Sequence, residues 1–165
     1  MKKSLGIQLS VEDCFYDSII SPLGNIYLVF SGEALVGVTF AKPGYRKASS
    51  PGETGRQFEA YFKGALRNFN IKTAFVSGTP FEKEVWLFLR NIEYGKTRSY
   101  KWLAEKIGRP KAVRAVGQAL KKNPLPIVFP CHRIIESDNS IGGYSFGADI
   151  KRRLLEMEYY FGMDG

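Results

Sequence analysis

This sequence has very few of the residues that form disulfides or bind metals. Its 165 residues include two cysteines, Cys14 and Cys131, and a single histidine, His132. Two cysteines do not make the disulfide framework of a small secreted protein, and one histidine beside them leaves no ordinary zinc site. We therefore expect no bound metal. Cys14 lies in an apolar, strand-like run and is interpreted as a small buried hydrophobe.

The sequence also lacks a long hydrophobic run. No stretch approaches the length that spans a membrane, and the basic start is not followed by the apolar segment of a signal peptide. We expect a cytoplasmic protein, or a nuclear one in a eukaryote, with no membrane partner. The chain can still build a core, because 44% of its residues are hydrophobic.

Acidic residues are nearly absent from one segment, residues 96–123. It holds nine basic side chains against Glu105 alone, which accounts for the whole net charge of +8. The basic residues are Lys96, Arg98, Lys101, Lys106, Arg109, Lys111, Arg114, Lys121 and Lys122. A run of charge is usually a solvated face. Its concentration in one helical segment favours a polyanionic partner, with nucleic acid first.

The first half of the chain, residues 1–76, predicts a small domain with an antiparallel sheet. Three β-branched and aromatic runs, 14–21, 24–30 and 34–40, are separated by turn signals. A polar loop is expected over 42–55. Apolar residues at helical spacing from Phe58 to Phe69 predict a helix, and 71–76 predicts a returning strand.

The second half, residues 77–165, predicts mostly helix. Thr79 and Glu82 form a capping box with Pro80 at the first helical position. Ser99 is expected to cap a short helix that stops at Gly108. A third helix is expected to open at Pro110, which gives a helix-turn-helix pattern, and a last helix begins near Asp149.

Small residues recur in the predicted third helix, and two accounts of them stay open. They are Ala112, Ala115, Gly117 and Ala119. One account is close packing against a neighbouring helix. The other is a slim surface that approaches a DNA groove, from which Arg114 projects. Gly117 costs the helix about 1 kcal/mol relative to alanine, so it needs one of these reasons.

The run Pro130-Cys131-His132-Arg133 places the one histidine beside a cysteine. Its apolar flanks predict an extended backbone, in which adjacent side chains point to opposite faces. A direct hydrogen bond between Cys131 and His132 is therefore awkward, and a bridging water or a local kink is needed. A neighbouring base favours the nucleophilic thiolate. The pair alone does not exclude a buried structural cysteine.

The longer run NPLPIVFPCHRII resembles the active-site signature of the O6-alkylguanine-DNA alkyltransferases, the methylated-DNA–protein-cysteine methyltransferases. SYKWLAEKIGRPKAVRAVGQAL resembles the helix-turn-helix of that family, and GGYSFG resembles its active-site loop. The resemblance covers residues 79–161. It implies an α+β fold in which a ribonuclease-H-like sheet domain packs on a mostly helical domain.

The resemblance also implies a reaction. Cys131 accepts the alkyl group from O6-alkylguanine, His132 is its base through a water molecule, and Glu158 orients His132. Asn123 braces the turn and Tyr100 donates a hydrogen bond to the base. The remaining contacts implied for the base come from Tyr144, Ser145 and the backbone carbonyls near Cys131 and Ile134. No cofactor is expected, and the stable thioether product implies a single turnover.

The implied partner is double-stranded DNA, bound by a monomer in the minor groove without sequence readout. The damaged nucleotide must be flipped out of the stack, and Arg114 is expected to fill the gap. Phosphate contacts are expected from Lys101, Arg109 and Lys111. Ala115 and Gly117 keep the helix slim.

One residue departs from the family pattern. Phe146 stands where many members carry glycine, and its ring is expected to narrow the pocket against large alkyl groups. Two other functions remain open: a helix-turn-helix regulator with an inert Cys131, and a Cys-His hydrolase that turns over.

Overall fold

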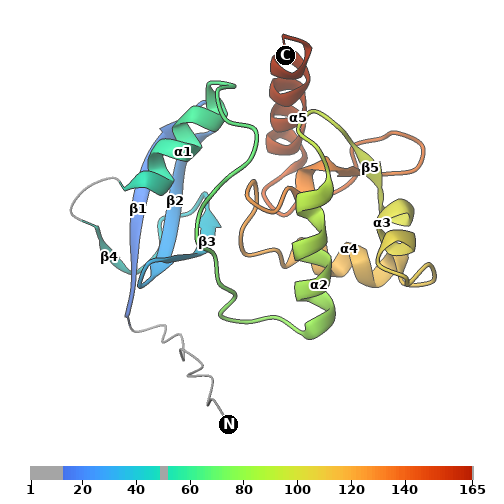
Figure 1. The fold of residues 1–165 in the computed structure, drawn as a ribbon, viewed down its shortest axis with the longest axis horizontal. Coiled ribbons are helices and arrows are strands. Elements are labelled where there is room, and N and C mark those ends of the chain that lie inside the picture. The colour runs from blue at the N-terminus through green and yellow to red at the C-terminus, as the bar shows by residue number, and fades with distance from the viewer. Residues whose placement is uncertain (1–12, 49–51, 165) are drawn as a thin grey trace.

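The computed structural model describes residues 13–48 and 52–164, and it has the expected α+β fold (Figure 1). A four-stranded sheet and one helix form the first part of the chain, and four helices dominate the second. The helices are α1 (Glu53–Phe62), α2 (Pro80–Phe88), α3 (Tyr100–Lys106), α4 (Val113–Lys121) and α5 (Ala148–Met163). Residues 1–12 and 49–51 of the predicted first domain lie outside the described ranges.

The predicted antiparallel strands are confirmed. β1 (Cys14–Ser21), β2 (Gly24–Ser31) and β3 (Ala34–Thr39) pair as successive antiparallel neighbours. Ser21 lies opposite Gly24, so β1 and β2 are joined by a two-residue turn, and Gly24 takes a positive φ of 101° there. The predicted loop contains a short strand that the sequence did not indicate, β4 (Arg46–Lys47), which runs parallel to β1.

Two predictions in the first part are wrong. The helix predicted to reach Phe69 ends at Phe62, because Gly64 takes a φ of 73°, and a Cβ there would lie 2.5 Å from the Phe161 ring. The segment 71–76 is not a strand, and only Thr73 forms an isolated bridge, to Leu35. The segment covers the outer edge of β3 without extending the sheet.

In the second part the predicted helix starts are confirmed where a side chain caps the helix. Thr79 and Glu82 form the reciprocal capping box of α2, and Ser99 accepts from the backbone of Trp102 at the start of α3. The third helix begins at Val113, three residues after the predicted Pro110, which lies in the turn between α3 and α4. No side chain caps the start of α4, so the sequence contains no capping residue that would mark where this helix begins.

A continuous hydrophobic core joins the two parts. It contains Leu28 of the sheet, Phe58 of α1, Trp86 of α2, Leu103 of α3 and Leu154 of α5, all essentially inaccessible to solvent. Figure 1 shows α5 rising between the sheet with α1 on one side and α2 with α3 on the other. Side chains of α5 contact both parts of the chain, because Glu158 accepts from Tyr61 of α1 and Leu154 belongs to the shared core.

The described ranges, 13–48 and 52–164, contain no helix with the length and apolar character that crossing a membrane requires.

Candidate active site

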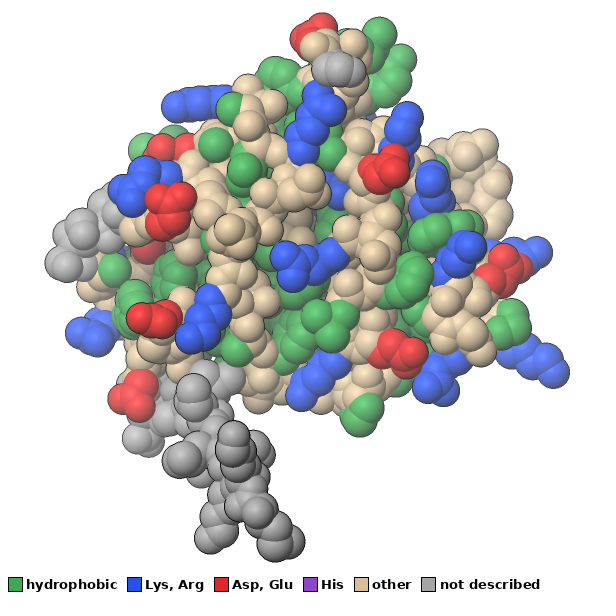
Figure 2. Space-filling view, viewed as in Figure 1, with side chains coloured by type: hydrophobic (Ala, Val, Ile, Leu, Met, Phe, Trp, Pro, Cys, Tyr) green, Lys and Arg blue, Asp and Glu red, His purple; other side chains and the backbone are tan. Residues whose placement is uncertain are grey.

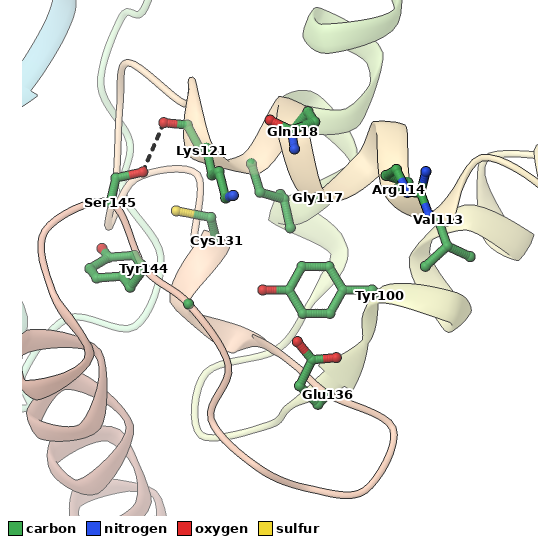
Figure 3. Close-up of a pocket in the computed structure, with 12 residues that line it drawn as sticks. Tyr100, Val113, Arg114, Gly117, Gln118, Lys121, Cys131, Glu136, Tyr144 and Ser145 are labelled. Atoms are coloured by element: carbon green, nitrogen blue, oxygen red, sulfur yellow. Dashed lines mark hydrogen bonds between the residues drawn. The ribbon is translucent and has the colours of Figure 1, made fainter.

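A cavity of about 330 Å³ opens beside Cys131 (Figure 3). Its walls come from the start of α3, one face of α4, the turn that carries Cys131 and the loop before α5. They include Tyr100, Arg114, Gly117, Lys121, Cys131, Glu136, Gly143, Tyr144 and Ser145. In Figure 3 the Tyr100 hydroxyl points toward the Cys131 end of the cavity, and Arg114 lies at the end far from Ser145.

The extended backbone predicted around Cys131 is wrong. Residues Cys131–Arg133 form a 3-10 turn, in which the Arg133 N–H donates to the Pro130 carbonyl at 3.0 Å. Ile127 upstream takes a φ of 75°, so the chain bends before it reaches the cysteine. Successive side chains of a 3-10 turn are about 120° apart, so one can face the cavity while the next faces the core. This turn is the local kink that the sequence argument required.

Behind Cys131, the Glu158 carboxylate is a completely buried hydrogen-bond acceptor. Its Oε1 accepts from His132 Nε2 at 2.8 Å and from the Tyr61 hydroxyl at 2.7 Å. Arg133 donates to both oxygens at 2.9 Å, and the Gly95 N–H donates to Oε2 at 3.2 Å. We call these five residues the carboxylate cluster. Donors from α1, the Gly95 turn and the 3-10 turn thus meet one carboxylate of α5.

The carboxylate cluster fixes the tautomer of His132. Burial alone would raise the pKa of Glu158, but His132 and Arg133 outweigh it and hold that pKa well below its usual range. Burial also lowers the pKa of His132, so the imidazole is neutral at pH 7. An ionised carboxylate only accepts, so Nε2 carries the hydrogen. Nδ1 is then a free base, and it has no hydrogen-bond partner among the described residues.

Burial and two neighbouring side chains shift the pKa of the Cys131 thiol. Burial raises its pKa, whereas a hydrogen bond from the Asn123 side chain and the positive charge of Lys151 lower it. The Lys151 side chain is itself buried, donates to the Gly143 carbonyl at 3.2 Å and lies 5.9 Å from the centre of the Tyr100 ring. Burial lowers the pKa of Lys151 to about 8. A buried ammonium thus lies within electrostatic reach of the Cys131 sulfur.

The other predicted site residues take distinct places. Asn123 bridges its turn, accepting from the Leu125 N–H at 3.0 Å and donating to the Phe129 carbonyl at 2.8 Å. The Ser145 hydroxyl donates to the Lys121 carbonyl at 2.8 Å (Figure 3). Ile134 is buried at the start of β6 (Ile134–Ile135), which pairs with β5 (Arg98–Ser99), and does not line the cavity.

The predicted phosphate contacts lie outside the cavity on α3 and the turn that follows. Lys101 lies 4.0 Å from Glu105, and Arg109 lies 3.5 Å from Glu84 with its guanidinium over the Phe81 ring. Among the described residues, Lys111 and Arg114 have no carboxylate within salt-bridge distance. Figure 2 shows blue basic side chains projecting on the side where Figure 1 places α3.

The small residues of α4 lie in three different environments. Ala119 is buried, Ala115 is exposed and Gly117 lines the cavity. A Cβ on Gly117 would lie 3.9 Å from the Tyr100 ring, which is an ordinary contact. Close packing therefore explains Ala119 but does not require glycine at 117.

Sequence reasoning missed Arg133, Tyr61, Gly95 and Lys151. Arg133 adjoins His132, so its proximity to the site was visible, but its role as partner of Glu158 was not. Lys151, Leu154 and Glu158 follow at spacings of three and four residues and share the buried face of α5. Two charged residues on an otherwise apolar face were the available signal for Lys151.

Phe146 does not narrow the cavity as expected, because it is not among the residues that line it. Its ring lies 4.9 Å from the ring of Phe40 and 5.7 Å from that of Tyr144, measured between centroids. The side chain is turned toward the end of β3.

Residues 80–160 match the family model described as 6-O-methylguanine DNA methyltransferase, DNA binding domain. The chain is 44% identical over 154 residues to the methylated-DNA–protein-cysteine methyltransferase of Methanosarcina barkeri, covering 87% of this chain and 96% of that protein. It is 36% identical to the protein of the same name from Haemophilus influenzae, covering 87% and 86%.

The fold is also similar to that of solved structures. The crystal structure of Mycobacterium tuberculosis O6-methylguanine methyltransferase superimposes with a TM-score of 0.82 at 36% identity, covering 89% of this chain and 93% of that one. The structure of Mycobacterium tuberculosis OGT in complex with DNA gives 0.82 at 37% identity, covering 89% and 94%. The similarity spans both parts of the fold and includes the run around Cys131, so the chain belongs to the methylated-DNA–protein-cysteine methyltransferase family.

Proposed function

We propose that this protein repairs DNA by moving the alkyl group of O6-alkylguanine onto its own Cys131. The observation that carries the proposal is the arrangement around the sulfur. A cysteine lines a cavity, and a buried carboxylate accepts from Nε2 of the neutral imidazole beside it, which leaves the other ring nitrogen as a base. This repeats the nucleophile, base and orienting acid of hydrolytic triads.

The reaction begins with loss of the thiol proton from Cys131. His132 Nδ1 takes that proton through a water molecule, and the imidazolium that forms is stabilised by Glu158. The thiolate attacks the alkyl carbon, so an S–C bond forms as the C–O6 bond breaks. The electron pair of that bond leaves with guanine, and a proton from the site neutralises the base.

Two further side chains assist the change of charge. Lys151 stabilises the thiolate electrostatically, and its burial makes the interaction stronger than it would be in water. Tyr100 donates a hydrogen bond to the departing guanine. Burial raises the pKa of Tyr100, so its hydroxyl stays protonated and able to donate. The product is a thioether, which nothing in the described residues removes, so each molecule reacts once.

We propose that DNA is bound through α3 and α4 as a helix-turn-helix, with α4 in the minor groove. Arg114, at one end of the cavity, is placed to fill the stack when a nucleotide is flipped into it. Gly117 and Ala115 keep this face of α4 slim beside it. Lys101, Arg109 and Lys111 contact phosphates without reading sequence. One chain supplies every wall of the cavity, which supports action as a monomer.

We also propose that the chain divides into an N-terminal domain, 1–76, and a C-terminal domain, 77–165. The family match that starts at residue 80 supports this boundary. The sheet order β3-β2-β1-β4, with β4 parallel to β1, supports a ribonuclease-H-like first domain. Backbone carbonyls near Cys131, which lines the cavity, accept from the exocyclic amine of the base, whereas Ile134 lies behind the cavity wall.

Intact-protein mass spectrometry tests the function. After incubation with duplex DNA that contains O6-methylguanine, the protein gains one methyl group on Cys131 and then stops reacting. A Cys14→Ala variant is the matched control and gains the same group, whereas Cys131→Ala gains none and still binds DNA. A protein that stays unmodified is a DNA-binding regulator, and one that turns over an acyl substrate is a hydrolase.

A further inference from the structure

The loop that carries Tyr144 and Ser145 is held at three points by three different segments of the chain. Lys151 of α5 donates to the Gly143 carbonyl at 3.2 Å. The Ser145 hydroxyl donates to the Lys121 carbonyl at the end of α4 at 2.8 Å. Phe146 contacts Phe40, which follows β3 and belongs to the first part of the chain. The first two contacts come from the part that carries the chemistry, and the third does not.

The position of Phe40 is itself fixed against the active-site turn. The Val38 N–H, two residues earlier in β3, donates to the Pro124 carbonyl at 2.9 Å. Pro124 follows Asn123, whose side chain bridges the turn and lowers the pKa of Cys131. The same strand thus contacts both the turn beneath the nucleophile and the loop beside it.

The rings of Phe40, Phe146 and Tyr144 form a continuous row, which we call the aromatic row. Phe40 and Phe146 are 4.9 Å apart with their planes tilted by 56°, and Phe146 and Tyr144 are 5.7 Å apart at 66°. Both geometries are favourable for aromatic pairs. Tyr144 lines the cavity with Cys131, whereas the other two rings do not. The row therefore leads from the sheet to the wall of the cavity.

We propose that Phe40 and Phe146 are positioning residues for the alkylated base, because the aromatic row sets the place of Tyr144 in the cavity wall. The proposal rests on the proposed function, and it gives the N-terminal sheet a part in substrate binding. It also assigns Phe146 a role other than obstruction. Its ring supports the loop from outside, so removing it loosens the wall instead of enlarging the cavity.

The test uses the full chain and free O6-benzylguanine, which avoids any effect on DNA binding. The single-turnover reaction is followed against base concentration to obtain a half-saturating concentration and a limiting rate. Phe40→Ala is expected to raise the half-saturating concentration about tenfold, because a misplaced wall binds the base poorly. The limiting rate changes less, since Cys131, His132 and Glu158 are held by other elements.

Three variants separate positioning from general packing. Phe40→Tyr keeps the ring and restores wild-type values. Phe15→Ala removes a ring from β1 of the same sheet, away from the aromatic row, and leaves both constants unchanged. The double variant Phe40→Ala/Phe146→Ala behaves like either single variant, because the rings act as one unit. If Phe40→Ala does not fold, Phe146→Ala on the loop is measured in its place.

The outcomes distinguish the two proposals. A wild-type protein that never alkylates Cys131 overturns the proposed function. A reactive wild type whose Phe40→Ala or Phe146→Ala variants keep the same half-saturating concentration overturns the aromatic row. A Phe146→Ala variant that binds the benzyl compound more tightly does so too, because that result means the ring obstructs the cavity.

Discussion

The two sides of Cys131 differ in how deeply their residues are buried and in how fully their polar groups are hydrogen-bonded. Behind it, the carboxylate cluster is buried, and the Glu158 oxygens accept from side chains and backbone of three other segments. In front, most of the side chains that wall the cavity are half-buried or exposed, and the Tyr144 hydroxyl interacts with the Cys131 thiol. The difference separates two tasks. The rear fixes a protonation state, and under the proposed function the front receives the alkylated base.

The largest effect is expected at the rear. Glu158→Gln leaves Arg133 as a buried unpaired charge, which costs about 3–5 kcal/mol in the free energy of unfolding. Loss of the orienting carboxylate slows transfer on the order of a hundredfold or more. Thermal melting and methyl transfer to Cys131 measure the two effects. Glu156→Gln, exposed on the same helix, is the control and changes neither; equal loss in both variants would contradict the assignment.

The next effect is expected at the front and only on duplex DNA. Arg114→Ala leaves the cost of flipping uncompensated, so repair of the duplex slows on the order of a hundredfold. Reaction with free O6-benzylguanine stays at the wild-type rate, because that compound needs no flipping. Comparing the two rates in each variant is the measurement. Equal losses on both substrates would mean that Arg114 supports the cavity itself.

Lys151 is a buried charge close to Cys131, so replacing it tests whether a buried group can also affect the reacting side. Lys151→Met removes a charge that lowers the Cys131 pKa, so less thiolate forms at pH 7 and transfer slows on the order of tenfold. Stability at pH 7 is unchanged or higher, because a buried ammonium is replaced by an apolar chain of similar length. Methyl transfer and melting temperature are compared with those of Lys63→Met, an exposed control.

The pH dependence of melting checks the same residue. Folding lowers the pKa of Lys151 from 10.5 to about 8, so the folded state binds fewer protons between these values. The contribution of this group to stability therefore rises as pH increases from about 8 toward 10.5, and Lys151→Met lacks that rise. A variant that keeps the full rise would exclude Lys151 as its source.

The smallest effect is expected from Gly117→Ala. The added Cβ meets the Tyr100 ring only at 3.9 Å, so it fits, and the alanine stabilises α4 by about 1 kcal/mol. Reaction with the free base stays unchanged, whereas affinity for duplex DNA falls slightly, because α4 becomes bulkier. Filter binding and melting measure these outcomes. A gain in DNA affinity would contradict the account of a slim helix.

Local sequence signals predicted much of this fold. They did not predict all of the residues that surround Cys131. The caps of α2 and α3 were predicted because Thr79 and Ser99 bond to backbone within three residues. The start of α4 was wrong because no side chain caps it. The strand predicted at 71–76 failed because pairing there depends on the edge of β3, which the segment itself does not encode.

The carboxylate cluster shows why part of the site was missed. The family resemblance, and not a local pattern, implied that His132 and Glu158 belong together, and His132 Nε2 lies 2.8 Å from Glu158 Oε1. Tyr61 meets Glu158 across 97 positions of sequence, and Gly95 donates through its backbone. Neither contact has a local pattern. The bend before the 3-10 turn at Cys131 was also missed, because a positive φ is rare for a β-branched residue such as Ile127.

The central claim is that His132 is a neutral base whose Nδ1 is free for the thiol. Because the chain has one histidine, labelling all histidine with ¹⁵N gives the NMR signals of this imidazole alone. The account predicts a neutral ring with hydrogen on Nε2 and none on Nδ1 at pH 7. It also predicts that the ring stays neutral below pH 6.5, the ordinary pKa of histidine, because burial lowers that pKa. A hydrogen on Nδ1 at pH 7, in either the other tautomer or the imidazolium, would contradict it.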